Sequence, residues 1–317
     1  MSTVAQAIEV HLKSVLIATD FSGASEKPLR HALAIARRYG AKFYLAHVIS
    51  SRGFTIAGPD TVIAAADAVW RDARRLDEDL VKSGALAGLR HEVIVRQGEV
   101  WEELEKIIRQ EHVDLVVIGT HGRRGLGKLL LGSVAEQIFR HADCPVLTVG
   151  PGSFQEAPIE GTRPIRPFLF ATDFGEASLH ALPFAISSAN LFGAKLALLH
   201  VVAGVPIPEG NRWYTAGDVM RMQENARVAS LRRLEELTRN ATLEVKPEFI
   251  VEFGSASPVS KKIMEAAENL RVDVIIMGLH RSTHVGTAAH MPWATAYEVV
   301  CAADCPVLTV RSAGRDS

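Results

Sequence analysis

Cysteine is scarce in this chain, with three residues among 317. Three thiols cannot all pair with one another, and two of them, Cys144 and Cys305, stand in the same repeated phrase. The N-terminal residues Met-Ser-Thr-Val-Ala-Gln also lack the charged and then apolar pattern of a signal peptide. These features exclude a disulfide-rich secreted scaffold, and we expect a reducing, cytoplasmic location.

The sequence also has no long apolar run, no excess of either charge and few aromatic residues. No apolar run approaches the ~18 residues of a membrane-spanning helix. The 35 basic and 36 acidic side chains leave a formal net charge of −1, and only 6% of residues are aromatic. Trp70 and Trp101 lie in helical patterns and are interpreted as packing groups. We therefore expect neither nucleic acid nor a membrane as partner, and binding has to be local.

What the sequence does contain is an internal repeat. Leu-Ile-Ala-Thr-Asp-Phe at 16–21 returns as Leu-Phe-Ala-Thr-Asp-Phe at 169–174, and His-Val at 47–48 returns at 200–201. The phrase Ala-Asp-Cys-Pro-Val-Leu-Thr-Val at 142–149 returns unchanged at 303–310. The chain is therefore one domain written twice. We expect domains at 1–150 and 165–312, a Gly- and Pro-containing linker at 151–164, and a tail at 313–317.

Each copy alternates apolar strands with amphipathic helices. In the first copy the expected strands are 14–19, 42–48, 91–95, 115–118 and 146–149. The expected helices are one that ends at Gly40 and three at about 61–81, 99–110 and 133–140. The second copy repeats this order from about 168 to 310. This alternation predicts an α/β fold of two tandem doubly wound, Rossmann-like domains, each with a five-stranded parallel sheet.

The loop after the fourth strand suggests a binding function. From Gly119 to Ser133 it contains five glycines and three cations. Glycines let backbone N–H groups approach an anion, and a helix that starts at Ser133 adds unpaired N–H groups and a positive dipole end. We expect this loop to bind a polyphosphate.

Two phosphate-loop patterns can be compared with this segment. The stretch from Gly122 to Lys128 fits the core of a Walker A loop, but Leu129 stands where that motif needs a hydroxyl for Mg²⁺, so we reject it. The alternative spacing is Gly-x2-Gly-x9-Gly-Ser, from Gly119 to Ser133, and it resembles the ATP-binding motif of the universal stress protein family. Ala-Thr-Asp-Phe and His-Val resemble further phrases of that family, and the resemblance covers nearly the whole chain.

The resemblance implies a tandem universal stress protein with an adenine-nucleotide alpha hydrolase-like fold. ATP, with Mg²⁺, would lie over the carboxyl ends of the first copy's strands. Asp20 would lie near the ribose and the metal-bound phosphates, and the Val48 backbone would contact adenine. The residues assigned to the nucleotide are Ala18, Thr19, Asp20, Val48, Ile118, Gly119, His121, Gly122, Arg123, Gly132, Ser133 and Val134, with Asp20 also assigned to the metal. No residue is assigned a catalytic role.

Several of these side chains have simpler alternative roles. Asp20 could cap the next helix, and for its counterpart Asp173 capping is the preferred interpretation. His121 could act as a general base, although orienting the loop or touching phosphate is preferred. Five side chains of the second copy could be metal ligands, but their spacing matches no familiar zinc pattern, so a structural role is preferred for them. They are His280, His284, His290, Cys301 and Cys305.

The second copy has lost the phosphate loop. Gly278 remains, but Arg281 replaces the next glycine. Met291-Pro292 or Trp293-Ala294, depending on the alignment, replaces Gly132-Ser133. Proline offers no N–H to a phosphate, and tryptophan would fill the space of a nucleotide. We expect ATP in the first copy only.

The resemblance also implies a stress-related regulatory role, in which nucleotide occupancy changes conformation or the choice of an unknown protein partner. We expect an intrachain pseudo-dimer of the domains and a homodimer, formed through the edges of the strands at 146–149 and 307–310. One alternative is a slow ATPase or an adenylyl-transfer enzyme of the wider adenine-binding α/β group. Another is a scaffold that binds no nucleotide.

Overall fold

The computed structural model describes residues 10–50, 59–120, 131–153, 164–203, 215–254, 257–280 and 294–312. The chain forms two compact units. The first consists of His11–Pro164 with Val300–Leu308, and the second consists of Ile165–Val299 with residue 10 and residues from Thr309 on.

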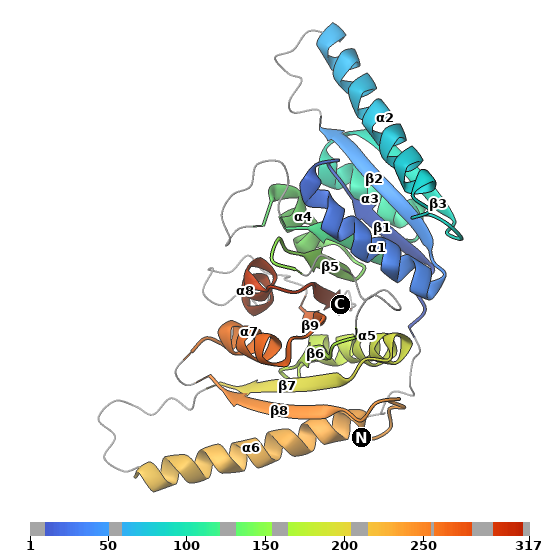
Figure 1. The fold of residues 1–317 in the computed structure, drawn as a ribbon. Coiled ribbons are helices and arrows are strands. Elements are labelled where there is room, and N and C mark those ends of the chain that lie inside the picture. The colour runs from blue at the N-terminus through green and yellow to red at the C-terminus, as the bar shows by residue number, and fades with distance from the viewer. Residues whose placement is uncertain are drawn as a thin grey trace. The chain divides into compact units, whose positions relative to one another are not determined.

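The first unit alternates strands and helices along the chain (Figure 1). Its strands are β1 (Ser14–Ala18), β2 (Lys42–Ser50), β3 (His91–Gly98), β4 (Leu115–Gly119) and β5 (Val146–Val149). Its helices are the short 3-10 helix η1 (Gly23–Ser25), α1 (Glu26–Tyr39), α2 (Pro59–Lys82), α3 (Val100–Gln110) and α4 (Ser133–His141). All the predicted elements are present, and the clearest difference is that β3 runs on to Gly98.

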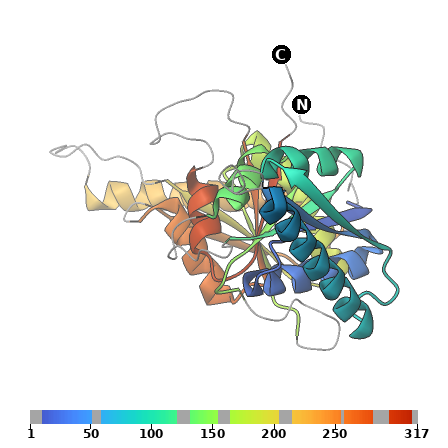
Figure 2. The same ribbon diagram turned by 90° about the horizontal axis from the view of Figure 1, so that it is seen from above.

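The strands of this unit form a parallel sheet in the order β3-β2-β1-β4-β5. Right-handed crossovers place α1 and α2 on one face and α3 and α4 on the other, an arrangement that can be followed in Figure 1 and Figure 2. The predicted doubly wound fold is confirmed. The strand order reverses between β1 and β4, so the carboxyl ends of these strands form the switch point where open α/β sheets bind ligands.

The second copy of the repeat has the same plan. Its strands are β6 (Phe168–Ala171), β7 (Leu196–Val202), β8 (Glu248–Phe253), β9 (Val274–Leu279) and β10 (Val307–Arg311). Its helices are α5 (Glu176–Phe192), α6 (Ala216–Thr238), α7 (Val259–Leu270) and α8 (Ala294–Ala302). The strand order is β10-β9-β6-β7-β8, and β6 through β9 pair in parallel. The repeat in the sequence is thus a repeat in the fold.

The core of each unit lies between its sheet and its helices. Strands β1, β4, β5 and β6 are apolar and buried along nearly all of their length because helices cover both faces of the sheet. Phe43, Phe139 and Leu104 are among the largest fully buried side chains of the first unit, and Phe170 and Leu196 are among those of the second. Burying one such side chain contributes roughly 1.5–3 kcal/mol. The sheets are therefore firm supports for the segments at their carboxyl edges.

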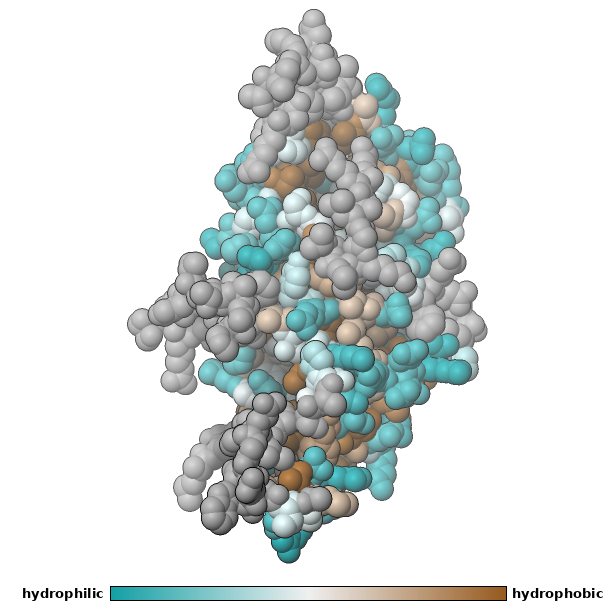
Figure 3. All heavy atoms as spheres, turned by 90° about the vertical axis from the view of Figure 1, so that its left-hand side faces the viewer, coloured by the Kyte–Doolittle hydropathy of each residue, from teal (hydrophilic) through white to brown (hydrophobic). Residues whose placement is uncertain are grey.

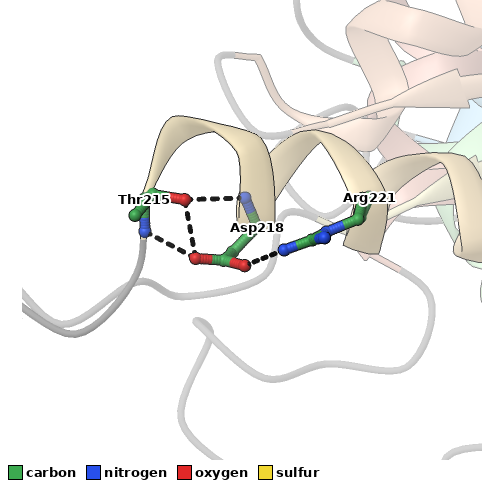
Figure 4. Close-up of polar contacts among 3 residues, drawn as sticks. All are labelled: Thr215, Asp218 and Arg221. Atoms are coloured by element: carbon green, nitrogen blue, oxygen red, sulfur yellow. Dashed lines mark hydrogen bonds and ion pairs between the residues drawn. The ribbon is translucent and has the colours of Figure 1, made fainter.

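Local signals in the sequence set several helix ends. Helices α1 and α5 stop at Gly40 and Gly193, whose φ angles of 64° and 66° are left-handed. Helix α6 begins with a capping box (Figure 4): Thr215 Oγ1 accepts from Asp218 N at 3.2 Å, and Asp218 Oδ2 accepts from Thr215 N at 2.9 Å. Arg221 pairs with the other oxygen of Asp218.

The surface is mixed in character. The coloured part of the face in Figure 3 mixes hydrophilic and hydrophobic residues. Met220 on α6 and Trp70 on α2 are 70% and 45% exposed, so Trp70 is not the buried packing group that its helical pattern predicts.

No helix within the described ranges has both the length and the apolar character needed to cross a membrane.

Candidate functional site

The candidate site lies at the carboxyl edge of the sheet in the first unit. Ile17 of β1 pairs with Leu45 of β2 and with Val117 of β4. Because these strands are parallel, the residues just beyond them meet at one edge. This edge brings together six of the residues assigned to the nucleotide: Ala18, Thr19, Asp20, Val48, Ile118 and Gly119.

A tight turn follows β1. Thr19 N donates to Ala46 O at 2.9 Å and extends the ladder, while Thr19 Oγ1 accepts from Phe21 N at 3.0 Å. Phe21 has a φ of 57°, a left-handed conformation that is rare for a bulky side chain. The turn leads the chain out of the buried strand and into η1.

Asp20 forms the centre of this turn. Its Oδ1 atom accepts from Ser22 N at 3.0 Å, from Ser22 Oγ at 2.6 Å and from Ser25 Oγ at 3.0 Å. These bonds fix the turn before α1, but among the described residues no side-chain hydrogen bond caps η1 or α1, so the capping alternative is not seen. The bonds to Asp20 do not exclude a ligand, because an ionised carboxylate has about four acceptor positions.

His47 on β2 holds the same turn from the neighbouring strand. Its Nδ1 atom lies 2.6 Å from Thr19 O, and its ring stacks on Phe21 with centroids 4.7 Å apart and an interplanar angle of 26°. A carbonyl oxygen can only accept, so Nδ1 carries the proton. In the sequence His47 is part of a repeated His-Val phrase, and no role is predicted for its side chain. Its return as His200 beside a second Thr-Asp-Phe is the signal that could have identified it.

The two ends of the glycine-rich loop lie at this edge. Gly119 ends β4, and Gly132 N donates to Thr120 O at 2.8 Å, which joins the ends directly. Gly132 is also the N-cap of α4, and no side chain of the described residues caps the helix there. Ser133 at the start of α4 is exposed, and Val134 is half-buried. An uncapped, exposed helix start offers N–H donors to an anion.

Three residues assigned to the nucleotide, His121, Gly122 and Arg123, lie outside the described residues. The same holds for His284 and His290 of the second copy.

Metal ligands of side-chain type are sparse. Among the described residues, no group of three or more His, Cys, Asp or Glu side chains could hold a metal ion. This does not conflict with Mg²⁺, which is commonly bound through one or two carboxylates and the phosphates of its nucleotide. The three cysteines are free thiols, and burial raises the pKa of Cys144 to about 12. A thiol that stays protonated is a poor ligand and a poor nucleophile.

The second unit repeats the turn at the end of β6. Phe174 N donates to Thr172 Oγ1 at 2.9 Å, and Phe174 has a φ of 61°. His200 Nδ1 lies 2.8 Å from Thr172 O, and its ring centroid lies 4.4 Å from that of Phe174. Asp173 Oδ1 accepts from Gly175 N at 2.8 Å and from Ser178 Oγ at 2.9 Å. Gly175 is itself the N-cap of α5, so Asp173 holds the turn before the helix, and among the described residues no side-chain hydrogen bond caps α5 as predicted.

The charges around this second turn differ from those of the first copy's phosphate loop. Partial desolvation raises the pKa of Asp173, but hydrogen bonds from Gly175 and Ser178 and the charge of His280 hold it below its usual value. Burial lowers the pKa of His200, and the charge of Arg233 lowers it further. The guanidinium carbon of Arg233 lies 4.1 Å from the centroid of the Phe174 ring.

Gly278 has a packing role in the second unit. A Cβ atom there would lie 2.2 Å from the carbonyl carbon of Ala177 and 2.4 Å from Ser178 N. The backbone of α5 therefore packs directly on β9, and this explains the glycine without any phosphate. The residues that replace the phosphate-loop positions in this unit, Arg281, Met291, Pro292 and Trp293, lie outside the described residues.

Comparison with known proteins matches both halves of the chain. The model of the Universal stress protein family matches residues 11–150 and 164–311. Universal stress protein MJ0531 of Methanocaldococcus jannaschii is 32% identical over 145 residues, which cover 43% of this chain and 81% of that protein. Universal stress protein MJ0577 of the same organism is 29% identical over 157 residues, which cover 45% of this chain and 97% of that protein.

Two solved structures resemble the whole chain. A universal stress protein from Archaeoglobus fulgidus has a TM-score of 0.66 and 21% identity, and the match covers 95% of this chain and 99% of that one. Protein PA1789 of Pseudomonas aeruginosa, described as functionally unknown, has a TM-score of 0.60 and 15% identity, with 97% and 95% covered. At these identities the likeness shows the fold alone, and that fold spans both copies.

Proposed function

The chain belongs to the universal stress protein family, and from that premise we propose that its first copy binds ATP and that its second copy is a degenerate partner. The nucleotide lies over the carboxyl ends of β1, β2 and β4, at the switch point of the sheet. The adenosine end meets the Val48 backbone and Asp20. The phosphates meet the glycine-rich loop between Gly119 and Ser133.

The uncapped start of α4 is the observation that carries this proposal. The chain places Gly132, which has no side chain, at the N-cap and exposes Ser133. The bond from Gly132 N to Thr120 O brings this helix start to the end of β4. A helix N-terminus at the switch point of a parallel sheet is a favourable place for a phosphate, because backbone N–H groups and the helix dipole both favour negative charge.

The residues present are compatible with Mg²⁺ as a companion of the nucleotide. Asp20 is the carboxylate at this edge, and its Oδ1 atom is already a hydrogen-bond acceptor for Ser22 and Ser25. We assign the Asp20 carboxylate to the metal or to the ribose. Bound Mg²⁺ would neutralise phosphate charge, and the N–H groups of α4 would orient the phosphates.

We further propose a regulatory rather than a catalytic role in a reducing, cytoplasmic compartment, where occupancy of the loop changes the choice of protein partner. The free thiols of the chain fit that compartment. The homodimer and the intrachain pseudo-dimer belong to this proposal. A partner-dependent switch needs only a difference in affinity between the loaded and empty forms.

Calorimetry with ATP tests the site. Wild-type protein should bind ATP, and Gly122→Val should weaken binding at least tenfold, because a β-branched side chain restricts the loop and blocks the approach of phosphate. Arg281→Val, which changes the position that corresponds to Gly122 in the second copy, is the matched control and should leave the affinity unchanged. Unchanged affinity in Gly122→Val would remove this site assignment, and rapid phosphate release by the wild type would favour the enzyme alternative.

A further inference from the structure

The two copies share a histidine contact that the phosphate loop does not explain. His47 and His200 each place Nδ1 against the carbonyl of the threonine that follows the first strand of their copy, at 2.6 Å and 2.8 Å. Each ring also lies against the phenylalanine two residues further on. The second copy lacks the Gly-Ser end of the loop and still keeps this contact. The contact therefore serves the turn itself.

The geometry shows what the contact controls. Thr19 O belongs to the planar peptide unit that joins Thr19 to Asp20, so fixing this oxygen limits the rotation of the backbone at Asp20. Two further hydrogen bonds hold Thr19: its N donates to Ala46 O, and its Oγ1 accepts from Phe21 N. The stacked ring of His47 supports Phe21 in its left-handed conformation, which costs energy for a residue of this type. His47 thus restrains the backbone on both sides of Asp20.

We propose that His47, with a proton on Nδ1, is the positioning residue for Asp20 in the nucleotide site. This inference rests on the proposed function of the first copy. In the second copy His200 performs the same task for Asp173, whose carboxylate accepts from Gly175 N and Ser178 Oγ at the start of α5. The same histidine contact therefore orients a carboxylate toward a ligand in the first unit and toward the start of a helix in the second.

Three variants test the role of His47 through ATP affinity. His47→Leu removes the hydrogen bond and should weaken ATP binding about tenfold. His47→Asn carries an amide N–H at the same number of bonds from the backbone as Nδ1, so it should recover most of that loss. His200→Leu changes the matching turn in the second copy and should leave ATP affinity at the wild-type value. A wild-type affinity in His47→Leu, or no recovery in His47→Asn, would overturn the proposal.

A second measurement keeps this inference separate from the proposed function. In ¹⁵N-histidine-labelled wild-type protein, both His47 and His200 should show the proton on Nδ1 at neutral pH, with or without ATP. If the wild type binds no ATP, the proposed nucleotide site is wrong. The tautomer measurement still tests whether His47 Nδ1 donates to Thr19 O in the turn. A proton on Nε2 of His47 refutes the positioning role itself. Circular dichroism of His47→Asn shows whether the fold is intact.

Discussion

At Gly278 the backbone of α5 leaves no room for a side chain on β9. A Cβ atom would lie 2.2 Å from the carbonyl carbon of Ala177, and neither backbone can move alone. We expect Gly278→Ala to lower the free energy of unfolding of the second unit by about 3 kcal/mol, at the upper end of the cost of overpacking. Urea unfolding followed by circular dichroism measures this change.

Gly217 provides the control for this substitution. It lies in α6, and the nearest heavy atom to a Cβ there, Thr215 Oγ1, is at an ordinary 3.6 Å. Because alanine is a better helix former than glycine, by about 1 kcal/mol in a helix interior and by less in the first turn, Gly217→Ala should not destabilise the same unit. If both variants unfold at the wild-type urea concentration, the close packing of α5 on β9 is wrong.

The stability of the second unit should depend on the protonation of His200. Burial lowers its pKa below the usual 6.5, and the charge of Arg233 acts in the same direction. The folded state then holds the proton less tightly than the unfolded state. Its contribution to stability is complete above pH 6.5 and is lost as the pH falls through the lowered pKa of the folded state.

Urea unfolding at a series of pH values from about 8 down to about 5 can detect this effect. The wild type should lose stability below pH 6.5, and His200→Asn, which keeps an N–H donor without a titrating ring, should lose less. The pKa of Asp173 lies below its usual 3.8 and so contributes a loss only at lower pH. The same pH dependence in both proteins would contradict the assignment to His200.

At the scale of helices and strands, most of the fold can be predicted because the relevant signals are local. Gly40 and Gly193 stop their helices, and apolar runs mark the strands. Contacts between distant residues have no such signal. His47 and Thr19 are 28 residues apart, and the packing behind Gly278 depends on a helix about a hundred residues earlier.

The candidate site is predictable to the same degree. The strand ends that carry Ala18, Asp20 and Gly119 follow from the βα alternation, so their meeting at one edge can be predicted from the sequence. The bonds of Asp20 to Ser22 and Ser25 depend on the exact path of the turn, which the residue pattern does not specify. The helical pattern predicts Trp70 as a packing group, yet its side chain is largely exposed. An amphipathic pattern gives the face of a helix and not the extent of the sheet beneath it.

Helix α7 ends on a residue whose backbone is strained. Arg271, its C-cap, has a φ of 51°, in the left-handed region where Gly40 and Gly193 end their helices without a Cβ. The left-handed conformation costs a residue with a Cβ roughly 1–2 kcal/mol, and the extra freedom of glycine in the unfolded chain offsets part of this. Arg271→Gly should raise the free energy of unfolding by about 0.5–1 kcal/mol.

Thermal unfolding of Arg271→Gly and Arg271→Ala separates the backbone from the side chain. Alanine removes the guanidinium and keeps the strain, so it should leave the melting temperature at or below that of the wild type. Glycine should raise it. A higher melting temperature in the alanine variant than in the glycine variant would show that the side chain, and not the φ angle, limits this helix end.

For the whole molecule, duplication has kept the fold and changed the binding segment. Both units have the same strand order and the same Thr-Asp-Phe turn held by a histidine. The glycine-rich loop with its Gly132-Ser133 end occurs in the first copy only. The buried sheet tolerates few changes in volume, while a connecting loop at its edge can change freely. A difference in ligand binding between the copies is therefore the expected result of their divergence.

This difference gives a prediction for stoichiometry. Affinity for triphosphate depends on backbone donors and charge at the loop, and each charge-assisted hydrogen bond contributes about 1.5–3 kcal/mol. Losing two or three of them weakens binding by a factor on the order of a thousand, since about 1.4 kcal/mol corresponds to tenfold. Arg281 could pair with a phosphate, but Pro292 supplies no N–H at the corresponding loop end.

Equilibrium dialysis should accordingly find one tightly bound ATP per chain, held by the first copy. Gly122→Val should abolish that single site, whereas Arg281→Val should leave one site per chain. Adenosine, which needs no phosphate donors, is the useful comparison: the strand-end phrases occur in both copies, so it should discriminate between them less than ATP does. Two equivalent ATP sites per chain would show that the second copy kept a phosphate site, and that the donors of the glycine-rich loop do not decide where ATP binds.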